Sequence, residues 1–156
     1  ALPGQLPPPL RMKFADVTDA DGKVTDVTLL QAAEAVHRQL RTELPSDYVA
    51  KMERVFAGGA RMSVALLNDR VAGVAVYRVY ENTADGRKFY VDDLVTDAEL
   101  RSTGIGKALF AYLQDKARQL GCRVFALDSG TQRHDAHRFY FREGMRIASF
   151  AFKKQL

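Results

Sequence analysis

Residues 89–96 read Phe-Tyr-Val-Asp-Asp-Leu-Val-Thr, and after a short acidic link residues 101–108 read Arg-Ser-Thr-Gly-Ile-Gly-Lys-Ala. The first segment is rich in aromatic and β-branched residues and predicts a strand. Beyond the second segment, apolar residues recur at helical spacing as far as Leu120 and predict a helix. A glycine turn in between presents unpaired backbone N–H groups at the positive end of the helix dipole, and Arg101 and Lys107 add charge. The pattern therefore predicts a site for a phosphate or pyrophosphate.

Two familiar phosphate motifs do not fit this turn. A P-loop requires a glycine where Arg101 stands and a hydroxyl residue where Ala108 stands. A dinucleotide fingerprint requires a third glycine at the position of Leu109. The remaining pattern, Arg-x-x-Gly-x-Gly-Lys-Ala after a strand, resembles the pyrophosphate-binding motif of the GNAT N-acetyltransferase superfamily, which binds acetyl-coenzyme A (acetyl-CoA). The alternative interpretation is an ordinary glycine-containing connection between a strand and a helix.

Composition limits the class of protein. A chain of 156 residues with 47% hydrophobic and 27% charged residues fits one folded domain. We expect a disordered, proline-rich leader over 1–10 and a single domain over 11–156. No apolar run reaches the length of a membrane span, and one cysteine excludes an intrachain disulfide, so the prediction is a cytoplasmic protein without a membrane partner. The net charge of +4 suits an anionic cofactor, but no dense basic cluster predicts nucleic-acid binding.

The order of predicted elements indicates a mixed α/β fold. The predicted strands and helices occupy, in order, 11–17 (strand), 28–44 and 48–56 (helices), 62–67, 71–80 and 90–96 (strands), 108–120 (helix), 122–127 (strand), 132–143 (helix) and 145–152 (strand). Short turns make the strands from 62 to 96 antiparallel, whereas the strand–helix–strand step over 90–127 requires a parallel crossover. His37 in the first helix is assigned no role.

The resemblance covers most of the chain, from Arg11 to Phe152, and implies a particular fold. This is the GNAT-like acyl-CoA N-acyltransferase fold, an α/β (mixed α+β) architecture. Its central sheet is antiparallel in its first half and splayed between the fourth and fifth strands, where the pantetheine arm of the cofactor enters. The two helices after the first strand are where such folds commonly build the acceptor side.

Tyr140 is the first candidate catalytic residue. The segment Ala136-x-x-Phe139-Tyr140-x-x-x-Gly144 resembles the late helix of GNAT enzymes, in which the matching tyrosine commonly lies near the thioester sulfur. When an amine attacks acetyl-CoA, the leaving thiolate gains charge, and a phenol within hydrogen-bond reach can stabilise or protonate it. The alternative is that Tyr140 only packs in an aromatic run.

Asp92 and Asp93 are candidates for the general base. Adjacent strand residues face opposite sides of a sheet, so we expect only one of them to point into the acceptor cleft. The resemblance places an acidic residue at Asp92, four positions before Thr96. An ammonium acceptor must lose a proton before it attacks, and a carboxylate can take it directly or through water. The alternative is that both aspartates hold substrate cations or local donors and that water takes the proton.

The resemblance also implies the cofactor contacts. Backbone groups of Leu94, Val95 and Thr96 would pair with the pantetheine arm like an added strand. One residue departs from the family pattern: Arg133 stands where many relatives carry an asparagine that contacts pantetheine, and it would reach a phosphate or face solvent. The predicted pyrophosphate contacts are Arg101, Ser102, Thr103, Gly104, Ile105, Gly106 and Lys107. No metal site is predicted.

These expectations combine into a functional prediction. The protein is predicted to be an N-acetyltransferase that moves an acetyl group from acetyl-CoA to a primary amine of a small molecule or protein, by direct transfer in a ternary complex. The alternative is a non-catalytic GNAT-like domain that binds an acyl-CoA as a sensor or scaffold. The partners are acetyl-CoA and an amine acceptor, and a homodimer is plausible for the family.

Overall fold

The computed structural model describes residues 3–5, 10–101 and 103–156. Residues 1–2 and 6–9, which make up most of the predicted leader, and Ser102 of the predicted phosphate turn lie outside the described residues. The chain forms two compact units, Ala1–Ala126 and Leu127–Leu156.

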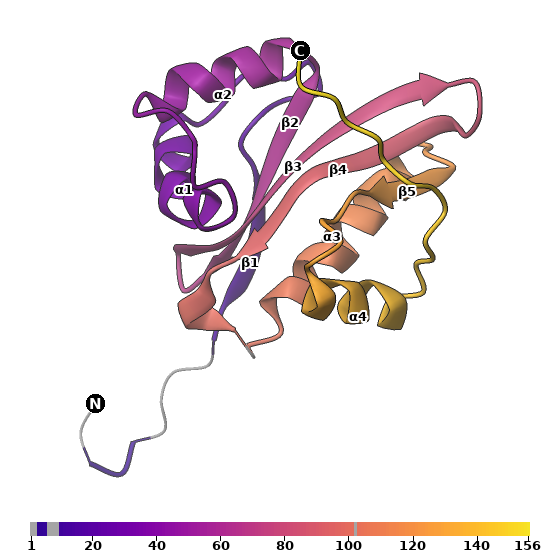
Figure 1. The fold of residues 1–156 in the computed structure, drawn as a ribbon. Helices are drawn as coiled ribbons and strands as arrows, with labels where there is room; N and C mark the ends of the chain where they lie inside the picture. Colours follow the sequence, from indigo (N-terminus) through magenta and orange to yellow (C-terminus); the bar gives the residue numbers. More distant parts are fainter. Residues whose placement is uncertain (1–2, 6–9, 102) are drawn as a thin grey trace. The chain divides into compact units, whose positions relative to one another are not determined.

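The first unit contains almost all of a five-stranded mixed sheet in the order β1-β2-β3-β4-β5 (Figure 1). The strands are β1 (Met12–Asp16), β2 (Ala60–Leu67), β3 (Arg70–Asn82), β4 (Gly86–Thr96) and β5 (Val124–Leu127). The pairs β1–β2, β2–β3 and β3–β4 are antiparallel, and β5 pairs with β4 in parallel. The predicted fold class is therefore confirmed.

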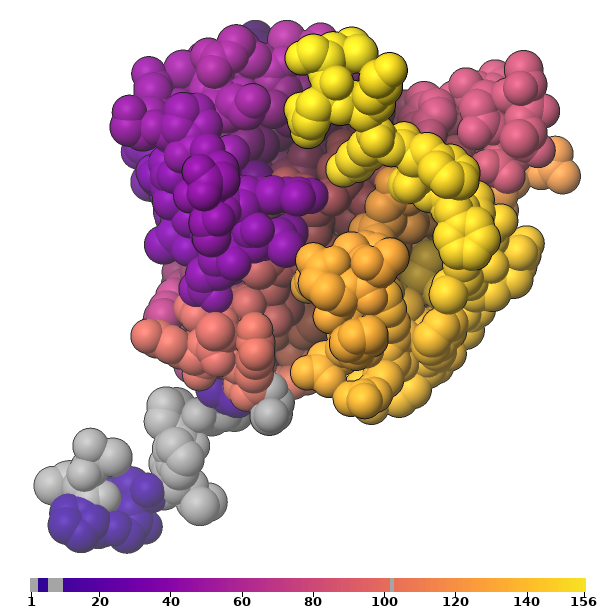
Figure 2. Space-filling model, viewed as in Figure 1, coloured from indigo at the N-terminus to yellow at the C-terminus, as the bar shows by residue number. Residues whose placement is uncertain are grey.

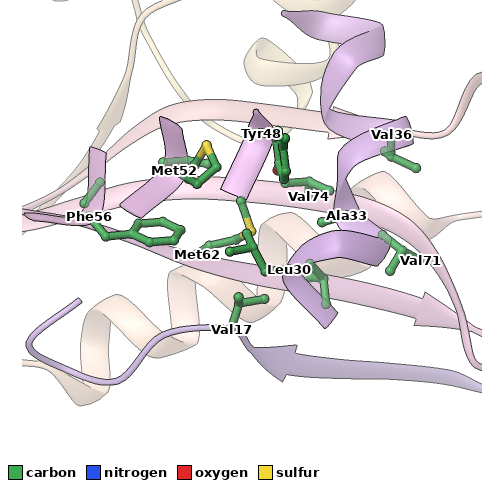
Figure 3. Packing of buried hydrophobic residues seen from close by; sticks show 13 residues of the cluster. Val17, Leu30, Ala33, Val36, Tyr48, Met52, Phe56, Met62, Val71 and Val74 are labelled. Carbon is green, nitrogen blue, oxygen red and sulfur yellow. The ribbon is translucent and has the colours of Figure 1, made fainter. Parts of the chain in front are cut away.

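Helices α1 (Val27–Leu40) and α2 (Tyr48–Ala57) cover one face of this sheet (Figure 1). Each begins at an aspartate whose carboxylate accepts a backbone N–H of the first turn, Asp26 from Leu29 and Asp47 from Ala50. Figure 3 shows the core between helices and sheet, to which Leu30, Ala33, Val36, Tyr48, Met52 and Phe56 contribute from the helices. Burying these apolar faces fixes both helices on β2 and β3.

Helix α3 (Ile105–Gln119) lies on the opposite face of the sheet (Figure 1). Aromatic rings stack on this face of the sheet. The ring centroid of Phe89 lies 4.4 Å from that of Tyr77 and 5.4 Å from that of Phe125. Phe110 of α3 meets Phe125 edge-on at 5.2 Å. These contacts hold β5 beside the first half of β4 and set the direction of α3.

The second unit contains α4 (His134–Arg142) and an extended tail. The predicted strand over 145–152 is wrong, since residues 145–156 form no strand. Alternating apolar residues produced the prediction, but a strand also requires a partner that completes its backbone hydrogen bonds. Large apolar side chains of this tail are exposed instead, among them Phe150 at 81% and Phe152 at 94%.

Candidate active site

A β-bulge in β4 lies at the centre of the candidate site. Val76 of β3 is opposite Asp93, and Tyr77 is opposite Val91, so Asp92 is an extra residue without a partner in the ladder. A bulge bends its strand and breaks the alternation of side chains. Asp93 reaches α1, while Asp92 is held by Arg78, which lies two residues after Val76 on the same face of β3. Both carboxylates therefore lie on the α1–α2 face, so the expectation that these adjacent residues face opposite sides of the sheet is wrong, while the expectation that only one points into the acceptor cleft stays a prediction.

Asp93 is held by two residues from α1 and its end. The carboxylate Oδ2 lies 2.7 Å from Nε2 of His37, and Oδ1 accepts from Nε of Arg41 at 2.8 Å and also from its Nη2. Burial of Asp93 raises the pKa of its carboxyl, but the hydrogen bonds from His37 and Arg41 outweigh burial, and the pKa is lowered. Asp93 is thus an ionised, hydrogen-bonded carboxylate at neutral pH.

Sequence reasoning missed His37, which is the most buried polar residue of this site, with 1% of its side chain exposed. Its Nδ1 lies 2.8 Å from the hydroxyl of Tyr48 at the start of α2, so the imidazole joins α1, α2 and β4. The position of His37 in the helix could have indicated its role. It follows Val36 on the apolar face that also carries Leu30 and Ala33. A polar residue on a buried face needs partners, and here it has two.

Asp92 forms a two-point ion pair with Arg78. The guanidinium donates from Nε to Oδ2 at 3.0 Å and from Nη2 to Oδ1 at 2.9 Å. The Arg78 guanidinium also lies 5.8 Å from the ring centroid of Tyr80 and 5.3 Å from that of Tyr90. The hydrogen bonds to Asp92 raise the pKa of Arg78 above its ordinary value. The guanidinium of Arg78 is therefore firmly oriented beside Asp92.

The second half of β4 presents one backbone edge to β3. Leu94, Val95 and Thr96 are paired with Ala75, Val74 and Gly73, respectively. On the other side β5 has four residues against the eleven of β4, and Arg123 just before β5 donates its backbone N–H to Arg87 near the start of β4. The shorter strand can pair with only part of its neighbour, which is the arrangement that the predicted splay requires.

Asp97 anchors the chain as it leaves β4. The buried carboxylate accepts the N–H of Glu99 at 3.0 Å, an Nε2–H of Gln39 at 3.2 Å and an Nη2–H of Arg70 at 2.9 Å. Gln39 in turn accepts the N–H of Ala98 at 2.9 Å. A short 3₁₀ turn, Ala98–Leu100, follows. Helix α1 thereby fixes the position at which the predicted phosphate turn begins.

The turn itself ends at the N-terminus of α3. Gly104 is the N-cap residue in a left-handed conformation, with φ of 81°, and a side chain added there would meet open space. Ile105, the first residue of α3, is buried, whereas the side chains of Arg101 and Lys107 are exposed. The first N–H groups of a helix have no partner within the helix, so this end is suited to an anion. Thr103 donates its hydroxyl to the carbonyl of Leu100 at 2.6 Å.

Tyr140 and Arg133 belong to the second unit. Tyr140 lies in the middle of α4, is buried and packs against the ring of Phe139. Burial raises the pKa of Tyr140, and the positive charge of Arg133 partly opposes this. Arg133 is the N-cap residue of α4, where its N–H donates to the carbonyl of Gly130. The assignment of Tyr140 as the general acid remains a prediction.

Other features bear on function less directly. Across the described ranges, no three His, Cys, Asp or Glu side chains cluster as metal ligands, and no helix is long and apolar enough to cross a membrane.

A shallow hollow of about 790 Å³ lies at the turn between β3 and β4 and includes Asp85 and Arg123. Figure 2 shows this turn, in pink, projecting away from the purple helices α1 and α2.

The mixed sheet, the bulged β4 and the glycine turn before α3 together define a GNAT-type acyltransferase. The sequence model of the Acetyltransferase (GNAT) family matches residues 28–145, so the chain belongs to this family and is an acetyltransferase. It is 39% identical over 121 residues to the uncharacterized N-acetyltransferase YhdJ of Bacillus subtilis, covering 74% of this chain and 84% of that protein.

Two further similarities extend this comparison. The aminoalkylphosphonate N-acetyltransferase of Salmonella typhimurium is 39% identical over 66 residues, which are 42% of this chain and 43% of that protein. The solved structure of the aminoglycoside N-acetyltransferase AAC(6')-Iy in complex with CoA has the same fold, with a TM-score of 0.79 at 18% identity. That match covers 97% of this chain and 99% of the other.

Proposed function

We propose that the protein transfers an acetyl group from acetyl-CoA to a primary amine of a small molecule or protein. The observation that carries this proposal is the glycine turn at the start of α3 in a chain of the GNAT family. The relatives named as N-acetyltransferases favour an enzyme over a domain that only binds an acyl-CoA. The acceptor amine is not carried over from any relative, because their names specify different amines.

The backbone supplies the contacts proposed for the donor. The N-terminal N–H groups of α3, together with Arg101 and Lys107, suit the pyrophosphate, since helix ends and cations stabilise anions. The edge of β4 over Leu94–Thr96, on the side away from β3, suits the amide groups of pantetheine. Gly104 leaves open space at the turn, which a bulky anion needs.

Direct transfer sets the chemistry that the side chains perform. The neutral amine attacks the thioester carbonyl, the C–N bond forms, and the C–S bond then breaks to release the thiolate of CoA. Before the attack the acceptor ammonium gives one proton to a carboxylate at the bulge, directly or through water. The thiolate takes a proton from Tyr140, which is replaced by the second proton that the nitrogen loses as the amide forms. The lowered pKa of Asp93 makes this carboxylate a weak base.

Thiol release tests this function. The full chain is mixed with acetyl-CoA and a panel of small amines, amino acids, polyamines and lysine-containing peptides, and free thiol is followed with time. Amine-dependent thiol release, with the acetylated amine identified by mass, supports the proposal. Intersecting initial-rate plots are expected for a ternary complex, whereas parallel plots and an acetylated enzyme would indicate a covalent intermediate.

We also propose that residues 11–156 act as one domain and that the protein works as a homodimer. Exposed apolar side chains in the tail after α4, including Ile147, Phe150 and Phe152, support an interface there. Large exposed apolar patches commonly mark association surfaces.

A further inference from the structure

We propose that the acceptor is a zwitterionic amine, whose acidic group is held by Arg78 while its ammonium group lies at Asp92 and Asp93. The inference rests on the proposed function and specifies its substrate class. The acid is a carboxylate or a phosphonate, both of which match the planar fork of a guanidinium.

The charge balance of the site favours a small zwitterion over a polycation. Asp92 is paired with Arg78, and Asp93 is paired with Arg41, so these four formal charges cancel. The neighbouring charges are also paired, as Arg38 with Glu34 and Lys88 with Asp85. A polycation gains most from a surplus of carboxylates, which this face lacks among the described residues. A zwitterion instead meets adjacent positive and negative groups.

Arg78 is prepared to bind a second acid. Asp92 uses two of the five N–H donors of the guanidinium and fixes its plane, and 44% of the side chain is exposed. Tyr80 and Tyr90 lie close to the guanidinium and limit its movement. Because the guanidinium of Arg78 is already held in place and is exposed, its side chain loses little conformational entropy when it binds an anion.

The position of Arg78 also matches the geometry of the reaction. An amine that transfers its proton to the carboxylates at the bulge, directly or through one water, lies near Asp92 or Asp93, and Arg78 is in contact with Asp92. An acid within a few bonds of that amine therefore falls beside Arg78. Arg41 is less suited, because two of its nitrogens converge on one oxygen of Asp93.

The test compares matched acceptors at saturating acetyl-CoA. β-Alanine and 2-aminoethylphosphonate are compared with β-alanine methyl ester, which keeps the amine and lacks the acid, and with spermidine as the polycation. We expect kcat/KM for the better of the two acids to exceed that for the ester and for spermidine by roughly ten- to a hundredfold, the range for a hydrogen bond to a charged group. Equal or better use of the ester or of spermidine overturns the inference.

Variants assign the effect to Arg78. Arg78→Gln should remove most of the preference for the acid over the ester, and Arg78→Lys should retain part of it. Arg118→Gln, which breaks an exposed ion pair with Asp115 on α3, is the matched control and should leave the preference unchanged. Loss of the preference in Arg41→Gln with its retention in Arg78→Gln would overturn the assignment.

Binding separates this inference from the proposed function. If no amine releases thiol, the proposed activity fails, but calorimetry of β-alanine, 2-aminoethylphosphonate and the ester with the CoA-bound protein still decides the preference. Tighter binding of either acid that is lost in Arg78→Gln supports the zwitterion site. Equal binding of acids and ester contradicts it. Thermal melts establish that each variant is folded before it is compared.

Discussion

His37 connects three elements through its two ring nitrogens, and its contact with Asp93 has a kinetic consequence. In His37→Leu, which leaves no donor at this position, the carboxylate loses one of the hydrogen bonds that lower its pKa, while its burial, which raises the pKa, remains. If catalysis requires ionised Asp93, the acid limb of kcat/KM should move to higher pH. A pH–rate profile measures this shift.

Tyr48→Phe is the control for that experiment. It removes the hydroxyl beside Nδ1 and leaves the bond between His37 and Asp93 in place. Its acid limb should match that of the wild type. A purely structural role for His37 predicts the opposite pattern, in which both variants lose thermal stability and neither profile moves along the pH axis.

Tyr140→Phe tests the proposed general acid. The substitution removes one oxygen and keeps the buried ring, so packing changes little. If the phenol protonates the thiolate, kcat should fall on the order of 10²-fold. The affinity for acetyl-CoA should stay almost constant, because that interaction strengthens only as charge develops. Turnover within a few-fold of wild type, measured with an identified acceptor, would remove Tyr140 from the mechanism.

At the scale of elements, the bulge in β4 can be removed by deleting Asp92. The pairs Val76–Asp93 and Tyr77–Val91 would then follow one another in a regular ladder, and every flanking side chain would keep its face. We expect a folded protein with a straighter β4 and strongly reduced turnover. Asp92→Ala, which keeps the extra residue but lacks the carboxylate, is the comparison. Equal activity of the two variants would show that the bend of β4 contributes nothing to turnover beyond the loss of the Asp92 carboxylate.

The turn before α3 offers a matched pair of substitutions at Gly104. Asn and Asp have nearly the same shape and both tolerate the left-handed conformation that Gly104 adopts. Only Gly104→Asp adds a negative charge where the pyrophosphate is proposed to bind, so it should weaken CoA binding at least about tenfold relative to Gly104→Asn. Calorimetry and the CoA-induced rise in Tm measure the difference. Equal affinities would place the pyrophosphate elsewhere.

The sequence predicted most elements correctly because their apolar periodicity reflects burial within a single face. Helix α1 and strands β2 to β4 follow from such local patterns. The bulge could not be predicted, since one extra residue leaves no mark in composition. The contact between His37 and Asp93 joins residues 56 positions apart, and only the assembled fold brings them together. The strand expected over 145–152 failed because its partner is not encoded in its own pattern.

For the whole molecule, the exposed tail leads to a prediction about assembly. Phe150 and Phe152 lie two positions apart, so in an extended chain they point in the same direction and expose a continuous apolar strip. If this strip forms the proposed homodimer, wild-type protein should sediment as a dimer at micromolar concentration. Phe150→Ser combined with Phe152→Ser should shift it to the monomer.

The control for that measurement is Val27→Ser, which removes an exposed apolar side chain at the start of α1. It should leave the sedimentation of the dimer unchanged. A wild-type monomer at all concentrations would contradict the dimer, and a dimer that survives the double substitution would locate the interface elsewhere.

The buried phenols have a consequence for the behaviour of the protein in alkali. The chain has six tyrosines and no tryptophan, so its near-ultraviolet absorbance is that of phenols. Burial raises the pKa of Tyr48, Tyr112 and Tyr140, and it raises the pKa of Tyr77 to about 12. Unfolded chains ionise these phenols near 10, so native stability is full below that pH and is lost as pH climbs through the raised values. The red-shifted phenolate band therefore serves as a built-in optical signal of alkaline unfolding.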